Sequence, residues 1–278
     1  EPVVTLEKNT RVTTWSVSNM PAILKESFEP MWHELSTYVI FAPSDFQMQD
    51  YTGNMDSWSS FGKFIYELNR DRDQLPDNIR QTVHQLTDAL SDPVQKIARL
   101  YEYMQRNTRY ISVQLGIGGY QTYDATYVAT KGYGDCKALS NYMHSLLKEA
   151  GINSYSAWVR SGKYSHYLTT DFPSDQFDHV ILCVPLAKDT MWLECTSQTL
   201  PAGYLGDFTC DRYVLLFNEN GGKLVRTPKY GLKDNRQDRR ITAVLDNDAS
   251  LLLNASTRCT GLEGGYFHTL LYYYSKDK

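Results

Sequence analysis

The chain has 278 residues, of which 42% are hydrophobic and 22% charged, and its formal net charge is −4. These values are typical of a folded globular protein and exclude a disordered linker or a fibre. The weak negative charge argues against nucleic-acid binding. The longest strongly apolar stretch, residues 180–187, is far shorter than the roughly 20 residues that a membrane-spanning helix needs.

The N-terminal part of the chain is predicted to be rich in strands. Residues 3–17 have strand composition, and we assign residues 1–56 to the end of an N-terminal β-rich domain and a linker. Helical spacing of apolar residues then predicts helices over residues 57–69 and from Pro76 onward. A third helix is predicted after Asp92, with Asp92 as the N-cap and a proline at the first helical position.

The middle of the chain is predicted to be a compact α+β core over residues 57–232. Residues 110–115 are a candidate strand and residues 116–134 a loop. Asp135 is predicted to cap a long amphipathic helix that ends at Gly151. Helices followed by antiparallel strands are typical of the α+β class. The strands predicted after this helix cover residues 154–160, 177–184, 190–195 and 212–217.

The C-terminal part is predicted to be a β-hairpin. Residues 240–245 and 251–258 are strand-like and flank the turn signal Asp246-Asn247-Asp248. A further strand is predicted over residues 266–274. Because a lone hairpin cannot bury itself, we expect residues 233–278 to be the start of a truncated C-terminal β domain.

Cys136 lies at the start of the helix that Asp135 caps. The N-terminus of a helix carries partial positive charge, which stabilises a thiolate over a thiol. The glycine-containing approach, Gly132-Tyr133-Gly134, would let a substrate come close to the sulfur. These features favour a nucleophilic cysteine. The alternative is a small, buried structural cysteine.

A base and an orienting acid are predicted on two neighbouring strands. His179 opens one strand and Glu194 lies near the end of the next. If Val184 pairs with Asp189 across the intervening turn, His179 and Glu194 lie directly opposite each other on one face. A carboxylate in that position fixes the tautomer of an imidazole. The alternative is a His–Glu pair on the protein surface.

Three motifs in this order resemble those of the transglutaminase-like superfamily, which is related to papain. The motifs are Gly134-Asp135-Cys136-Lys137-Ala138-Leu139, Phe177-Asp178-His179-Val180 and Trp192-Leu193-Glu194-Cys195-Thr196. The chain is similar to a bacterial subgroup in which this core lies between two β-rich domains of unassigned function. The resemblance implies a cysteine-bearing helix packed on an antiparallel sheet. The family acid is usually Asp, whereas this sequence has Glu194.

The resemblance also implies a reaction. The Cys136 thiolate would attack an amide or ester carbonyl, His179 would hold and return the proton, and Glu194 would orient His179. Gln114 is a candidate oxyanion donor, with a solvated polar side chain as the alternative. Gln121 is a second candidate for the oxyanion donor.

Tyrosines crowd the approach to Cys136 and could line a substrate groove or anchor the loop. They are Tyr120, Tyr123, Tyr127 and Tyr133. Of these, Tyr133 is a candidate substrate-binding residue, and Gln121 is a second candidate.

The sequence therefore predicts a cysteine-dependent acyl-transfer enzyme that hydrolyses peptide or amide bonds in a peptide or protein substrate. One alternative is a non-catalytic transglutaminase-like module that binds ligands or holds neighbouring β domains together in a bacterial envelope protein. Another is a carbohydrate- or peptidoglycan-binding protein, suggested by 21 tyrosines against 10 phenylalanines. No cofactor is expected, and the histidines lack the spacing of a metal site.

The resemblance implies a periplasmic, envelope or secreted location in a Gram-negative bacterium, although the first residues lack the pattern of a signal peptide. We expect the core to contact the flanking β domains within the same chain.

Overall fold

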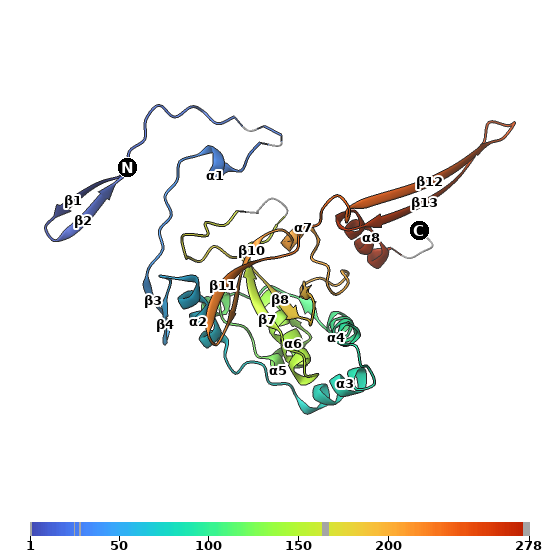
Figure 1. Cartoon of the computed structure of the whole chain (residues 1–278), viewed down its shortest axis with the longest axis horizontal. Helices are drawn as coiled ribbons and strands as arrows, with labels where there is room; N and C mark the ends of the chain where they lie inside the picture. Colours follow the sequence, from blue (N-terminus) through green and yellow to red (C-terminus); the bar gives the residue numbers. More distant parts are fainter. Residues whose placement is uncertain (1, 25, 28, 163–166, 275–278) are drawn as a thin grey trace. The chain divides into compact units, whose positions relative to one another are not determined.

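The computed structural model describes the chain except for residues 1, 25, 28, 163–166 and 275–278. It divides into two compact units, residues 1–41 and residues 42–278. The first unit contains β1 (Val3–Glu7), β2 (Thr10–Thr14) and the short helix α1 (Trp32–Leu35) (Figure 1). Lys8 and Asn9, between the strands, have φ angles of 45° and 69°, as a two-residue hairpin turn requires. The strands predicted near the N-terminus are therefore present as a hairpin.

The second unit is built around a five-stranded antiparallel sheet with the strand order β11-β10-β7-β8-β9 (Figure 1). Its strands are β7 (Tyr155–Val159), β8 (His179–Pro185), β9 (Thr190–Leu193), β10 (Tyr213–Asn218) and β11 (Gly221–Arg226). Strand β11 lies at one edge and was not predicted. It begins with Gly221 and Gly222, which lack the side chains that indicate a strand.

Helices cover one face of this sheet: α2 (Trp58–Asn69), α3 (Asp77–Thr87), α4 (Pro93–Asn107), α5 (Ala125–Lys131) and α6 (Cys136–Glu149). On that face Leu182 and Val184 of β8 pack in one hydrophobic core with α3, α4 and α6. Val180 and Trp158 pack in a second core with α2. The cysteine-bearing helix thus lies on an antiparallel sheet, which confirms the predicted α+β fold class.

The opposite face of the sheet has a smaller hydrophobic core. Ile181 and Cys183 point to this side, because side chains alternate along β8. They pack against Leu205 and Cys210, which flank the short helix α7 (Gly206–Thr209). Helix α7 therefore lies on this face of the sheet, where its Thr209 contacts Glu194, the residue that follows β9.

The predicted helix starts are confirmed by their caps. The Asp92 side chain accepts a hydrogen bond from Val94 N–H at 3.0 Å, and the Asp135 side chain accepts one from Ala138 N–H at 2.9 Å. Each cap satisfies a backbone donor that the helix itself cannot pair. The start of α6, and with it the position of Cys136, is therefore encoded locally.

The segment before α6 contains more structure than the predicted loop. Strand β5 is only Arg109–Tyr110, and it pairs in parallel with β6 (Tyr133–Gly134). The 3₁₀-helix η1 (Gly116–Gly119) and helix α5 lie between them. Helix α5 is only seven residues long, too short for its apolar spacing to predict it.

A second hairpin, which was not predicted, lies within the predicted N-terminal segment 1–56 and belongs to the second unit. It consists of β3 (Asp45–Met48) and β4 (Tyr51–Asn54). The ring centroids of Phe46 and Phe64 of α2 lie 4.7 Å apart. A Cβ atom at Gly53 would lie 2.2 Å from the Phe46 ring, so only glycine allows this packing. The predicted limits of the core and of the β domains on either side remain predictions.

The C-terminal hairpin has the predicted arrangement, and it is longer than predicted. Strands β12 (Arg236–Leu245) and β13 (Leu251–Thr260) pair antiparallel along their whole length. The predicted strand over residues 266–274 is wrong, because this segment lies in helix α8 (Leu262–Tyr273). The Asn235 side chain accepts a hydrogen bond from Leu262 N–H at 2.8 Å and so satisfies a backbone donor at the start of α8. None of the described helices is long and apolar enough to cross a membrane.

Candidate active site

Cys136 is the first residue of α6 and is 3% exposed. Its backbone N–H has no acceptor within the helix, because the first N–H groups of a helix have no preceding turn to bond to. A Cβ atom at Gly134 would lie 2.7 Å from the Cβ atom of Ala138, so a larger residue would displace the start of the helix. The glycine, the capping aspartate and the cysteine of this motif therefore form one local structure.

The helix is tied to the strand that carries the histidine. One turn beyond Cys136, the Ser140 hydroxyl donates a hydrogen bond to the carbonyl oxygen of Val180 at 3.3 Å. Val180 directly follows His179 on β8, so this contact ties the first turns of α6 to the strand that carries the imidazole.

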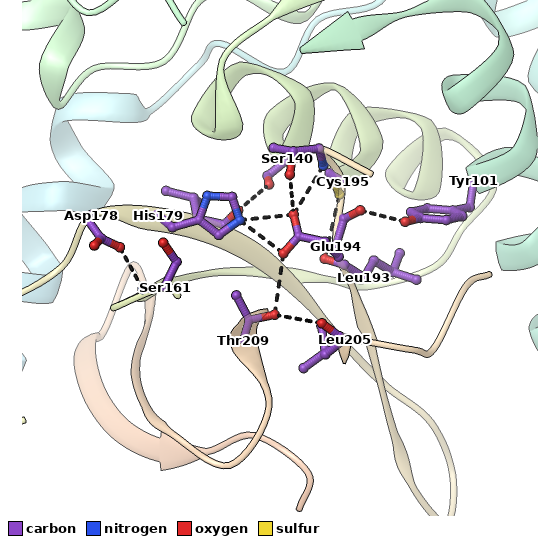
Figure 2. Close-up of polar contacts among 12 residues, drawn as sticks. Tyr101, Ser140, Ser161, Asp178, His179, Leu193, Glu194, Cys195, Leu205 and Thr209 are labelled. Atoms are coloured by element: carbon purple, nitrogen blue, oxygen red, sulfur yellow. Dashed lines mark hydrogen bonds and ion pairs between the residues drawn. The ribbon is translucent and has the colours of Figure 1, made fainter. Parts of the chain in front are cut away.

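His179 and Glu194 are in direct contact. The His179 Nε2 atom lies 3.0 Å from both carboxylate oxygens of Glu194, and the two residues are 7% and 3% exposed (Figure 2). The imidazole therefore has one nitrogen held by the carboxylate and the other, Nδ1, left for a partner on its far side.

The predicted strand register is wrong by two residues. Leu182 pairs with Leu193 and Pro185 pairs with Thr190, whereas the prediction paired Val184 with Asp189. A shift of two residues keeps every side chain on its face. Glu194 consequently lies diagonally from His179 rather than opposite it, at a longer backbone separation. The extra methylene of Glu over the usual family Asp suits this longer span.

Glu194 accepts hydrogen bonds from three hydroxyl groups in addition to its contact with His179. The Thr196 hydroxyl donates to Oε1 at 2.5 Å, and the Thr209 hydroxyl of α7 donates to Oε2 at 3.4 Å. The Tyr101 hydroxyl donates to the backbone carbonyl of Glu194 at 2.5 Å (Figure 2). Each oxygen of the buried carboxylate therefore has a threonine hydroxyl as a partner besides His179, and a buried charge needs such partners.

The electrostatics favour a charged pair. Burial lowers the pKa of His179, but the charge of Glu194 and the hydrogen bonds to Cys136 and Glu194 outweigh it and raise that pKa to about 10. Burial raises the pKa of Glu194, yet the charge and hydrogen bond of His179 and the Thr196 donors lower it overall. At neutral pH the site holds an imidazolium between a carboxylate and the Cys136 sulfur.

A cavity of about 240 Å³ opens beside these residues. The described residues that line it include Cys136, His179 and Gln114, the residue predicted as the oxyanion donor. The other lining residues are Gly119, Tyr120, Lys137, Trp158, Asp175, Phe177, Asp178 and Val180. Of the four tyrosines noted in the sequence, Tyr120 lines the cavity.

The other two candidate substrate-binding residues point elsewhere. The Gln121 side chain donates to the Leu68 carbonyl at 2.8 Å, and the Tyr133 hydroxyl bonds that of Tyr127 at 2.7 Å. Neither belongs to the described lining of the cavity. Asp175, Trp158 and Phe177 were not predicted as site residues, and their spacing in the sequence gives no signal for them.

A larger cavity of about 530 Å³ lies near the other end of α6. His144, which lines it, bonds the Ser154 hydroxyl through Nδ1 at 2.8 Å. Among the residues that the structure describes, none lines both this cavity and the one at Cys136. Within the described ranges, no group of three His, Cys, Asp or Glu side chains could hold a metal ion.

Residues 80–194 match the family model of the transglutaminase-like superfamily, a range that includes Cys136, His179 and Glu194. A putative protease from Parabacteroides distasonis ATCC 8503 has a similar structure, with a TM-score of 0.54 at 16% identity. That match covers 90% of this chain and 47% of the other protein, so this chain spans about half its length. No curated protein matches the chain.

A putative cysteine protease from Cytophaga hutchinsonii is 10% identical, with a TM-score of 0.34. That match covers 68% of this chain and 55% of the other protein. The fold and the family match define an α+β protein with a papain-related, transglutaminase-like core. Within residues 80–194 the chain is similar to the transglutaminase-like superfamily.

The charged His179–Glu194 pair predicts a pH-dependent stability. His179 has a raised pKa, so its contribution is complete below its ordinary value of 6.5 and is lost as the pH rises toward about 10. Glu194 has a lowered pKa, so its contribution is present above its ordinary value of 4.5 and is lost in acid. Glu194→Gln should therefore cost most stability between these two ordinary values.

Urea unfolding of the wild type and Glu194→Gln checks this prediction. We expect a difference of about 3 kcal/mol near pH 6 that shrinks as the pH approaches about 9.5. The matched control is Glu102→Gln, which removes an exposed ion pair with Arg106 and should cost less than about 0.5 kcal/mol. A Glu194→Gln difference that stays constant across this range would contradict a charged pair.

Proposed function

We propose that this protein is a cysteine-dependent acyl-transfer enzyme that hydrolyses peptide or amide bonds through Cys136, His179 and Glu194. The observation that carries the proposal is the contact of His179 Nε2 with both oxygens of Glu194 at 3.0 Å, beside a cavity that Cys136 also lines. Cys136 is also one of the groups that raise the pKa of His179, so the order nucleophile, base and orienting acid runs from Cys136 through His179 to Glu194. The family match supports a cysteine-dependent enzyme in general.

The first half of the reaction forms a thioester. The Cys136 thiolate attacks the carbonyl carbon of the substrate, and the resulting oxyanion lies near the Cys136 N–H and the Gln114 amide. The tetrahedral intermediate collapses, the C–N bond breaks, and the His179 imidazolium gives its proton to the leaving amine. His179 is then neutral and its Nε2–H remains bonded to Glu194.

The second half releases the acyl group. Neutral His179 takes a proton from water, the hydroxide oxygen attacks the thioester, and the C–S bond breaks to give a carboxylic acid and the Cys136 thiolate. The imidazolium is restored beside the thiolate, so charges and protons balance over the cycle. The reaction needs no cofactor, and the proposed substrate is a peptide or protein outside the cytoplasm.

Alkylation of Cys136 by iodoacetamide tests the proposal. We expect Cys136 to react at least about tenfold faster than Cys259, the partly exposed free thiol, because the imidazolium favours the thiolate. His179→Gln should remove this advantage while the rate at Cys259 stays constant. Peptide mapping by mass spectrometry separates the two sites. If Cys136 is alkylated no faster than Cys259, or if His179→Gln leaves the alkylation rate of Cys136 unchanged, the core is a non-catalytic module.

A further inference from the structure

The cavity beside Cys136 has aromatic walls. Tyr120, Trp158 and Phe177 line it, and the centroids of the Tyr120 and Trp158 rings lie 6.0 Å apart at an interplanar angle of 38°. Trp158 is 6% exposed and belongs to the core between α2 and the sheet, so its ring is fixed. Rigid aromatic rings around a small cavity offer the negative faces that attract a cation.

A carboxylate lies at the rim of the same cavity. Asp175 is solvent-exposed and lines the cavity, and its Oδ2 atom accepts a hydrogen bond from the Tyr120 hydroxyl at 2.8 Å. The next residue, Gln176, holds the loop through bonds to the backbone of Thr169 and Phe172. Within the described part of the chain, no cation forms an ion pair with Asp175. The carboxylate is therefore positioned and available to a ligand.

The other charges of the cavity lining already have partners. The Lys137 ammonium is bonded to the Asp135 carboxylate, and the His179 imidazolium is bonded to Glu194. Asp178 accepts a hydrogen bond from Ser161 N–H at 2.7 Å (Figure 2). Both cations of the lining are thus neutralised by carboxylates outside it, and of the two lining carboxylates Asp175 is the one bonded to the aromatic residue Tyr120.

We propose that the cavity binds a primary ammonium group of the substrate, with Asp175 as its counter-ion and the Tyr120 and Trp158 rings as its walls. This inference rests on the proposed function, because it places the ammonium on the residue whose acyl group reacts with Cys136. A volume of about 240 Å³ suits one short side chain or one amino terminus rather than a long ligand.

Two thiol reagents of opposite charge test the charge preference directly. Aminoethyl methanethiosulfonate and sulfonatoethyl methanethiosulfonate react identically: the Cys136 thiolate attacks the reagent sulfur, a disulfide forms and methanesulfinate leaves. We expect the cationic reagent to react faster at low ionic strength. Asp175→Asn should lower the ratio of the two rates about tenfold, because it slows the cation and accelerates the anion, and high salt should have the same effect.

The matched control is Asp171→Asn, which removes an equal charge from an exposed position on the same loop outside the described lining of the cavity. Its rate ratio should stay within about twofold of the wild type. An Asp175→Asn ratio equal to that of Asp171→Asn would overturn the inference. Neutral methyl methanethiosulfonate separates the two proposals: failure of Cys136 to react with it counts against the proposed function itself.

Three p-nitrophenyl esters distinguish the source of the ammonium group. The ester of Nα-acetyl-lysine has only a side-chain ammonium, that of norleucine only an α-ammonium, and that of Nα-acetyl-norleucine neither. Asp175→Asn should lower kcat/KM about tenfold more for the ester whose ammonium the cavity binds than for the uncharged ester. Equal effects on all three esters would assign Asp175 a purely structural role.

Discussion

Cys136→Ser is expected to reduce acyl transfer by at least about four orders of magnitude while the fold is retained. The substitution is nearly isosteric at a residue that is 3% exposed, so the packing around α6 should persist. A serine hydroxyl at this position has a much higher pKa than a thiol, and the charge state of the His179–Glu194 pair favours an anionic sulfur rather than an alkoxide. Hydrolysis of a p-nitrophenyl ester by purified wild type and variant measures the effect.

The control for Cys136→Ser is Cys259→Ser. Cys259 is a free, partly exposed thiol on β13, and the same chemical change there should leave turnover unchanged. A Cys136→Ser protein that retains more than about a tenth of the wild-type rate would show that the reaction does not pass through this sulfur.

Glu194→Gln should lower turnover by about three orders of magnitude. The amide that replaces the carboxylate can donate to His179 Nε2 and so favour the tautomer that cannot accept a proton from the required side. It also removes the charge that raises the pKa of His179, so the imidazolium is lost nearer neutral pH. The kcat of ester hydrolysis should fall, whereas KM should change little, because Glu194 lies outside the described lining of the cavity.

Glu194→Asp separates geometry from charge. Asp keeps the negative charge but shortens the side chain by one C–C bond, about 1.5 Å. Glu194 reaches His179 along a diagonal of the strand pair. The shorter Asp side chain would therefore not reach the His179 imidazole as closely. We expect a loss of about 10- to 100-fold, between the wild type and Glu194→Gln. Equal activity of Glu194→Asp and the wild type would show that the site has not adapted to Glu.

Local signals predicted the position of Cys136 at the start of α6. Asp135 caps α6 through its own side chain, and the apolar stripe of that helix decides which face packs on the sheet. Both depend on residues close to Cys136 in sequence. The predicted contact of His179 with Glu194 also depends only on which face each side chain occupies, and the structure places them together despite the register error.

The rest of the site depends on distant contacts that sequence patterns do not encode. The turn between β8 and β9 lies one residue later than predicted: Leu186 N–H donates to the Asp189 carbonyl at 2.8 Å, and Pro185 pairs with Thr190. This displacement shifts the pairing by two residues, and the face pattern of the strands does not reveal it, because a two-residue shift keeps every side chain on its face. Asp175 and Trp158 reach the cavity from a loop and a strand whose local patterns are ordinary. The aromatic run at the C-terminus favours a strand by composition, yet it lies in α8, because tertiary context overrides this propensity.

Trapping the acyl-enzyme tests the central claim most directly. Wild-type protein is mixed with p-nitrophenyl acetate, quenched in acid within the first turnovers, and mapped by mass spectrometry. We predict one acetyl group on the Cys136 peptide, removable by hydroxylamine as a thioester is, with faster accumulation in the wild type than in Glu194→Gln. Acetylation at other residues while Cys136 stays unmodified would contradict the assignment of Cys136 as the nucleophile.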